Sequence, residues 1–298
     1  MRHTREVVGA WEHLPAARVA APLTPHVSSM YGYSAVGLDP GVHRGLPSAG
    51  LTLVLSLERP LRTAPTEEAW ADGVRDAQWV SLGGLHTRAA MVEQPGRWAG
   101  VQVTLRPVGV RRLLGVPAAE LPVGSWDARD LLGGEVDRVV EELHAAPGWP
   151  ARYAVVNRWL LRLAARAEAA TSRHGSPAEV EEAWRLLTGR RDVPVAAVAD
   201  AVGYSRRRLT QLLTAETGHG PKTLQRLARF DVARREVVAA ASTGSSLARV
   251  AARTGYYDQS HLVRDFHEFA GLGPSAWLAA EFPNVQGAPA GVAAASSA

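Results

Sequence analysis

A nearly repeated pattern between about Val195 and Leu278 constrains this chain more than any other feature. Each copy starts with Val-Ala, reaches a glycine four residues after the alanine, and closes with Gly-x-Gly-Pro. The copies run through Val198, Ala199, Gly203, Leu209, Leu213, Gly218 and Pro221, and through Val250, Ala251, Gly255, Leu262, Phe266, Gly271 and Pro274. The glycine-to-leucine step is 203 to 209 in the first copy and 255 to 262 in the second, so the turns differ by one residue. The chain therefore contains an internal duplication.

Both copies fit two short helices joined by a tight turn. Ala199 and Ala251 are small enough for a crossing helix to come close, and Gly203 and Gly255 can adopt the positive φ that a turn needs. This arrangement is typical of a helix-turn-helix, whose second helix enters the major groove of DNA. A single copy is a weak signal, because a packed helical hairpin needs small and apolar residues at the same spacings. Two copies with matching exits, separated by one helix, favour DNA binding.

Residues 250–266 read VAARTGYYDQSHLVRDF and are followed by Gly271-Leu272-Gly273-Pro274 and Trp277. This run resembles the C-terminal signature of the AraC/XylS family of transcription regulators, over roughly the last third of the chain. His267-Glu268 stand where the family usually has basic residues, and Leu278 follows Trp277 where a Tyr-Arg pair is common. The resemblance implies DNA binding by two helix-turn-helix units and a cupin-like, effector-binding domain in the N-terminal part.

The composition indicates a globular protein whose excess positive charge lies on the duplicated segment. The 298 residues suffice for two domains, and 46% of them are hydrophobic against 21% charged. From Arg190 to Arg264, thirteen Lys and Arg stand against six Asp and Glu, a local charge of +7. Almost all of these cations are arginine, which favours planar bidentate contacts.

Several classes of protein are excluded by the composition. The chain has no cysteine, which rules out disulfides, thiolate metal sites, thiol catalysis and the alkyl-transferring relatives of the family. No apolar run reaches the roughly 18 residues that a membrane span needs, and the first five residues are not followed by an apolar signal core. We therefore expect a cytoplasmic protein with no membrane partner.

Residues 1 to about 108 predict a β-rich domain. Short runs at 51–57 and 101–105, with weaker candidates at 79–82 and 89–92, are bounded by Gly and Pro as strands tend to be. Many short strands of this kind indicate a barrel or sandwich. Aromatic side chains either fill its core or line a pocket for an organic effector, and they are Tyr31, Tyr33, Trp70, Trp79 and Trp98.

His43 and His86 are the candidate metal ligands of this region. Cupin enzymes bind metals through a His-x-His…Glu…His set, and no second histidine stands two residues after His43. We therefore expect two surface or core histidines, and we predict no metal, no cofactor and no catalytic residue.

Three helices are predicted beyond the strands, at 110–117, 135–145 and 151–170. The last of these carries an apolar stripe, which either packs on its own domain or pairs two subunits. A homodimer therefore stays open. Next come a linker at 171–175 and a helix start with Ser176 as N-cap and Pro177 in the first position.

The predicted fold class is α+β with two domains. Residues 1–172 form a β-rich, cupin-like sensor that ends in helices, and residues 173–283 form an all-α DNA-binding domain with two helix-turn-helix motifs. Residues 284–298 are Ala, Gly and Ser without periodicity, and we expect a disordered tail there.

The face of each recognition helix opposite its buried apolar residues is predicted to meet DNA. A linking helix of about 19 residues, 222–240, spans roughly 28 Å, which is close to one DNA turn of about 34 Å. The exposed face and the resemblance give the candidate contacts Arg206, Arg207, Arg208, Thr210, Gln211, Lys222, Gln259, Ser260, His261 and Arg264. Lys222 is expected to meet phosphate, and Arg264 is expected to read a guanine.

We interpret the chain as a transcription regulator that binds double-stranded DNA. A small organic effector would modulate it, and RNA polymerase is a further partner if it activates. Two other classes stay open: an enzyme with a cupin-like β domain, and a protein-interaction module of helical hairpins. The enzyme lacks a Gly-rich phosphate loop, a Gly-x-Ser-x-Gly run and paired histidines. Weak binding of any duplex at low salt would favour the interaction module.

Overall fold

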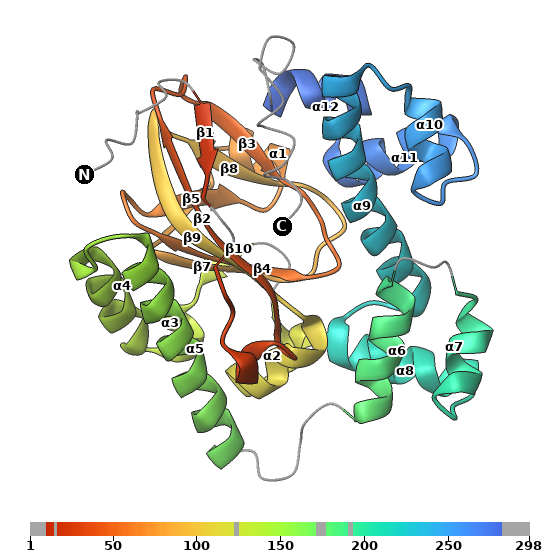
Figure 1. Cartoon of the computed structure of the whole chain (residues 1–298), viewed down its shortest axis with the longest axis horizontal. Helices are drawn as coiled ribbons and strands as arrows, with labels where there is room; N and C mark the ends of the chain where they lie inside the picture. The colour runs from red at the N-terminus through yellow and green to blue at the C-terminus, as the bar shows by residue number, and fades with distance from the viewer. Residues whose placement is uncertain (1–9, 15–16, 122–124, 171–176, 190–192, 282–298) are drawn as a thin grey trace.

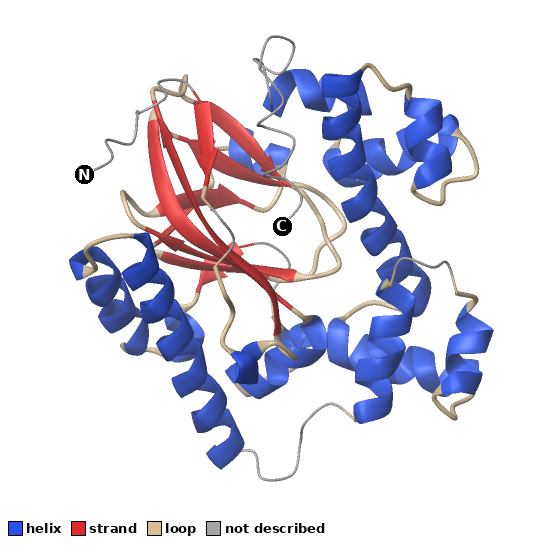
Figure 2. Ribbon diagram, viewed as in Figure 1, coloured by secondary structure: helices blue, strands red, loops and turns tan. Residues whose placement is uncertain are grey.

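The computed structural model describes residues 10–14, 17–121, 125–170, 177–189 and 193–281. The predicted linker and the predicted tail lie outside these residues. The N-terminal part contains two sheets, and the regular elements described from residue 177 onward are all helices (Figures 1 and 2). The predicted fold class is confirmed: a β-rich N-terminal region is followed by helices that run to the C-terminal part.

The larger sheet has six strands in the order β1-β2-β9-β4-β7-β10, and the smaller has four in the order β3-β8-β5-β6. Neighbouring strands are antiparallel throughout. The strands are β1 (Ala10–His13), β2 (Val27–Val36), β3 (Gly41–Gly45), β4 (Leu51–Ser56), β5 (Leu61–Ala64), β6 (Asp76–Gln78), β7 (Val80–Gly83), β8 (Ala90–Gln94), β9 (Arg97–Leu105) and β10 (Ser125–Asp127). All four predicted runs are confirmed as strands, namely β4, β7, β8 and β9.

Strand β4 lies in the middle of the larger sheet, which explains its composition. It pairs with β9 on one side and with β7 on the other, so both of its edges are hydrogen-bonded. Leu51 and Leu55 are fully buried, and so are Val101 and Val103 on β9. A central strand of this kind needs apolar residues on both faces, and the nearly continuous apolar run from Leu51 supplies them.

Helices cover one side of the larger sheet in the N-terminal part (Figure 1). They are η1 (Ala21–Leu23), α2 (Pro107–Leu114), η2 (Ala118–Glu120), α3 (Arg129–Leu132), α4 (Glu135–Ala145) and α5 (Trp149–Ala170), whereas α1 (Glu67–Ala71) contacts β5 and β8 of the smaller sheet. Helix α5 lies directly against β2, where a Cβ on Gly32 would stand 2.5 Å from the Trp149 ring. Gly32 is therefore required by close packing, and its backbone N–H donates to the Tyr153 hydroxyl at 2.9 Å.

The C-terminal helices are α6 (Ala178–Thr188), α7 (Val195–Ala201), α8 (Arg206–Thr217), α9 (Pro221–Thr243), α10 (Leu247–Arg253), α11 (Gln259–Ala270) and α12 (Pro274–Glu281). Helix α9 has 23 residues, so it spans about 34 Å rather than the expected 28 Å. The predicted cap residue Ser176 lies outside the described residues. Pro177 occupies the cap position of α6 instead of the first helical position that the sequence predicted.

Two large apolar cores are present among the described residues, and the boundary between them does not coincide with the predicted domain boundary at residue 172. The first contains the interior of the larger sheet, helices α2 to α6 and the first helix-turn-helix, including Leu209 and Leu213. The second contains the C-terminal half of α9 together with α10, α11 and α12. The first recognition helix therefore packs on the N-terminal part of the chain. The domain limits at 172 and 283 stay a prediction. None of the described helices is long and apolar enough to cross a membrane.

Candidate nucleic-acid interface

The two helix-turn-helix units have the same construction. Helices α7 and α10 have 7 residues each, and the recognition helices α8 and α11 have 12 each. In both turns a glycine takes a positive φ, 73° at Gly203 and 79° at Gly255. Side chains with a Cβ rarely adopt this conformation, so glycine is what allows the reversal. The repeated sequence is therefore a repeated structure, with α9 joining the two units (Figure 1).

Each recognition helix begins at a side-chain N-cap. The Ser205 hydroxyl accepts a hydrogen bond from the backbone N–H of Arg208 at 3.2 Å. The Asp258 carboxylate accepts one from the N–H of His261 at 2.7 Å. Both caps satisfy a helix N–H that has no partner within the helix. The first cap is neutral and the second carries a negative charge, which matters for a surface that approaches phosphates.

The predicted DNA contacts all lie on the outer faces of their helices. Nine of the ten are exposed, and His261 is half-buried because its ring packs edge-on against Tyr256 at 5.0 Å. The Thr210 hydroxyl donates to the carbonyl of Arg206 at 2.9 Å. The exposed set is Arg206, Arg207, Arg208, Thr210, Gln211, Lys222, Gln259, Ser260 and Arg264. Their role toward DNA stays a prediction.

Several cations on this surface have no carboxylate partner. Within the described residues, no ion pair engages Arg206, Arg207, Arg208, Lys222, Arg249 or Arg264. By contrast, the arginines further along α9 pair with acids, as Arg235 does with Asp231 at 3.2 Å. Unpaired guanidinium groups are available for phosphate oxygens, whereas paired ones are not.

The second recognition helix is held by a cation of the linking helix. Arg226 on α9 donates to Asp265 at 2.8 Å, and to the two oxygens of Glu268 at 3.0 and 2.6 Å. The Asp265 side chain is only 3% exposed. The hydrogen bond from Arg226 lowers the pKa of Glu268. Glu268 departs from the basic residue of the family pattern, and the structure gives the reason: it pairs with Arg226.

The first recognition helix is held by a cation from the N-terminal part. Arg111 on α2 donates to Glu216 near the end of α8, through Nε at 3.2 Å and through Nη2 at 3.0 Å. The Glu216 side chain is only 7% exposed. The Nε2 of His219 lies 3.3 Å from the carbonyl oxygen of Leu85. The orientation of α8 therefore depends on residues outside the duplicated segment.

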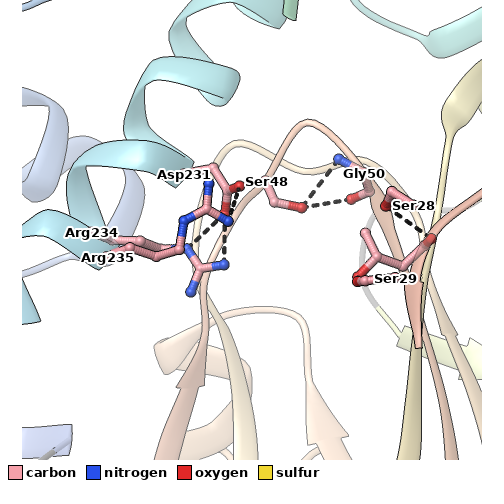
Figure 3. A network of polar contacts seen from close by, with 8 residues as sticks. Ser28, Ser29, Ser48, Gly50, Asp231, Arg234 and Arg235 are labelled. Atoms are coloured by element: carbon pink, nitrogen blue, oxygen red, sulfur yellow. Dashed lines mark hydrogen bonds and ion pairs between the residues drawn. The ribbon is translucent and has the colours of Figure 1, made fainter. Parts of the chain in front are cut away.

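Polar side chains in the middle of α9 lie beside the loop that precedes β4, and each segment makes its own hydrogen bonds (Figure 3). Asp231 accepts hydrogen bonds from Arg234 at 2.9 and 2.6 Å, and Ser48 donates to the carbonyl of Gly50 at 2.8 Å. Burial raises the pKa of Tyr31 on β2 to about 12, although the charge of Arg234 opposes the shift. The middle of the linking helix therefore lies against the strands.

The two candidate histidines have protein partners. Nδ1 of His43 hydrogen-bonds the Glu281 carboxylate on α12, and the backbone N–H of Arg44 donates to the same carboxylate at 2.8 Å. The ring nitrogens of His86 lie 2.9 and 3.3 Å from the carbonyl oxygens of Gly84 and Gly45. Among the described residues, no three metal-binding side chains gather. The expectation of no metal stays a prediction.

The candidate pocket aromatics are only partly brought together. Tyr33 and Trp98 pack edge-on at 5.8 Å, and His43 lies 6.0 Å from Trp98. Trp70 instead lies under the Arg75 guanidinium, and Trp79 packs against His144. These aromatics therefore form no single group, and Tyr33 on β2 and Trp98 on β9 belong to one small apolar cluster.

Sequence reasoning missed the residues that orient the recognition helices. The pairing of Arg226 with Asp265 and of Arg111 with Glu216 joins residues that are distant in sequence, so no local pattern predicts it. The sequence does show one difference between the two units, because the second turn is one residue longer than the first. The structure shows that this turn contains Tyr257, the most exposed large hydrophobic side chain of the described residues.

Comparison with known proteins identifies the duplicated segment. Residues 198–280 match the family described as Helix-turn-helix domain. The search of curated protein sequences found no significant match. The match begins within α7 and contains the whole of α8, α9, α10 and α11.

Solved structures of ToxT from Vibrio cholerae are similar over most of the chain. The crystal structure from strain O395 is 12% identical and covers 85% of this chain and 97% of its own, with a TM-score of 0.47. The structure of ToxT from strain SCE256 with a bound unsaturated fatty acid has 12% identity, coverages of 85% and 95%, and a TM-score of 0.46. At this level of similarity, the ligands and mechanism of ToxT cannot be transferred to this chain.

Proposed function

We propose that this chain is a sequence-specific, DNA-binding regulator of transcription, because its residues 198–280 form a helix-turn-helix domain of the AraC type. The observation that carries the proposal is the pair of exposed recognition helices with unpaired cations, joined by one 23-residue helix. That helix spans about 34 Å, the length of one DNA turn. Both recognition helices would then enter successive major grooves on one side of the duplex.

Positioning and reading would fall to different side chains. Arg206, Arg208 and Lys222 would neutralise phosphates, which sets affinity without sequence preference. Arg207 and Arg264 would read base edges, with Thr210, Gln211, Gln259, Ser260 and His261 beside them, because an exposed guanidinium can bind guanine O6 and N7 together.

The N-terminal part would act as the sensor. The division into a sensor of residues 1–172 and a DNA-binding domain of 173–283 belongs to this proposal. The apolar surroundings of Tyr33, Val54 and Trp98 support an organic effector rather than a metal. A stoichiometric transition metal in the purified protein, lost on changing His43 or His86, would contradict this part. A homodimer, RNA polymerase contacts and a cytoplasmic location fit a regulator and remain proposals.

One experiment tests the function on the full chain. A duplex is enriched from a random-sequence pool, and affinity is measured on it and on a scrambled duplex over a range of salt. Affinity should fall steeply as salt rises, because bound cations release counterions. Arg264→Ala should lose about 1–3 kcal/mol on the enriched duplex and much less on the scrambled one. Lys222→Ala is the matched control and should weaken both equally. Salt-independent binding would contradict the proposal.

A further inference from the structure

The backbone shows which residue lengthens the second turn. In the first unit the N–H of Tyr204 donates to the carbonyl of Ala199 at 2.9 Å, and the N-cap Ser205 follows at once. In the second unit Tyr256 makes the same bond to Ala251 at 3.0 Å, yet the N-cap is Asp258. The residue without a counterpart is therefore Tyr257.

The side chain of Tyr257 lies outside the apolar cores of the described residues. Its side chain is 94% exposed, against 55% for Val74, the next large hydrophobic residue in the described part of the chain. The preceding tyrosine is different, because Tyr256 is buried in the second core beneath the guanidinium of Arg229. Exposing an aromatic ring costs solvation without a packing gain. Its ring is therefore free to contact a partner outside the chain.

The position of Tyr257 indicates which partner. It stands immediately before the N-cap of α11, beside the exposed Gln259 and Ser260. The first unit has Arg206, Arg207 and Arg208 at the start of its recognition helix, whereas the first turn of α11 contains no arginine or lysine. The second unit also presents the Asp258 carboxylate there. The first turn of α11 therefore offers no Arg or Lys to a phosphate, whereas the exposed Tyr257 hydroxyl is an uncharged donor at this edge.

We propose that Tyr257 is a DNA-backbone contact of the second unit: its hydroxyl donates to a phosphate oxygen and its ring covers the neighbouring sugar. Tyrosine hydroxyls make such contacts and carry no sequence information. The inference rests on the proposed DNA-binding function. It assigns to the turn a role that arginines fill in the first unit.

The test uses the full chain with the enriched and the scrambled duplexes. Tyr257→Phe removes only the hydroxyl, and should weaken binding about tenfold on both duplexes, as loss of a hydrogen bond to a charged group does. Tyr257→Ala should weaken it further. The salt dependence should not change, because no cation is lost. Val74→Ala, which removes an exposed apolar side chain from the N-terminal part, is the control and should bind as the wild type does.

A methylphosphonate scan locates the contact. Neutralising one particular phosphate should weaken the wild type and leave Tyr257→Phe unaffected. Equal affinity of wild type, Tyr257→Phe and Tyr257→Ala would overturn the inference while leaving the proposed function intact. Unchanged affinity with reduced transcription from a reporter promoter would assign Tyr257 to a protein partner instead, and would also overturn it. A wild-type chain that binds no duplex would defeat the proposed function itself.

Discussion

The two helix-turn-helix units share a backbone and differ in what holds their recognition helices. Each recognition helix buries a carboxylate, Glu216 on α8 and Asp265 on α11. The counterion of Asp265 is Arg226, which belongs to the linking helix within the duplicated segment. The counterion of Glu216 is Arg111, which belongs to the N-terminal part. The buried carboxylate of α11 is therefore paired from within the duplicated segment, whereas that of α8 is paired with the region proposed to sense the effector.

The two units also differ in charge at the surface that faces DNA. The first recognition helix starts with three consecutive arginines behind a neutral cap. The second starts with polar residues behind an acidic cap and carries a single arginine, Arg264. Under the proposed function, the first unit would contribute most of the salt-dependent affinity and the second would contribute relatively more by hydrogen bonding.

The largest expected effect is the loss of the internal counterion. Arg226→Ala leaves Asp265 buried without its partner, and removing one member of a buried pair costs about 3 kcal/mol. Hydrogen exchange of the α11 amides should rise, while that of the α8 amides should not. Arg249→Ala is the control, because Arg249 is exposed and has no ion pair among the described residues. Equal protection of α11 in both variants would show that Arg226 does not hold the helix.

Loss of the external counterion should come second. Arg111→Ala leaves Glu216 with little access to water, and we expect a cost of about 2 kcal/mol in the free energy of unfolding. Arg112→Ala is a neighbouring control, because its partner Glu181 is 3.7 Å away and both side chains are substantially exposed. That pair should contribute less than about 1 kcal/mol. Urea unfolding of the two variants separates the cases, and equal midpoints would contradict the difference drawn between the units.

Sequence reasoning reached the features that depend on neighbouring residues. The duplicated turns could be predicted because a positive φ requires glycine at Gly203 and Gly255, and strand β4 could be predicted from its apolar run. The order of strands in the sheets was not predictable, since pairing joins distant segments. The ion pairs escaped for the same reason: Arg226 and Asp265 are 39 residues apart, and Arg111 and Glu216 are 105 apart. The exposed residues of the candidate site could be predicted from the sequence, whereas the ion pairs that hold its helices could not.

The smallest expected effect concerns two carboxylates, Glu268 and Glu181, whose pKa values are shifted in opposite directions. The hydrogen bond from Arg226 lowers the pKa of Glu268, so its contribution to stability is present above the unfolded pKa and is lost as pH falls through the folded one. Burial raises the pKa of Glu181, so its contribution is present below the unfolded pKa and is lost as pH rises through the folded one. Neutralising the two carboxylates should therefore change the free energy of unfolding in opposite directions at neutral pH.

Glu268→Gln should lower the urea midpoint at neutral pH, and Glu181→Gln should leave it unchanged or raise it. Because the Glu268 side chain is 52% exposed, solvent screening keeps its effect below about 1 kcal/mol. Both differences from the wild type should shrink toward about pH 3, where the native carboxyls also approach neutrality. A Glu181→Gln chain that loses as much stability as Glu268→Gln at neutral pH would mean that the Arg112–Glu181 pair between α2 and α6 stabilises the fold as much as the Arg226–Glu268 pair does. The opposite signs expected for the two carboxylates would then be wrong.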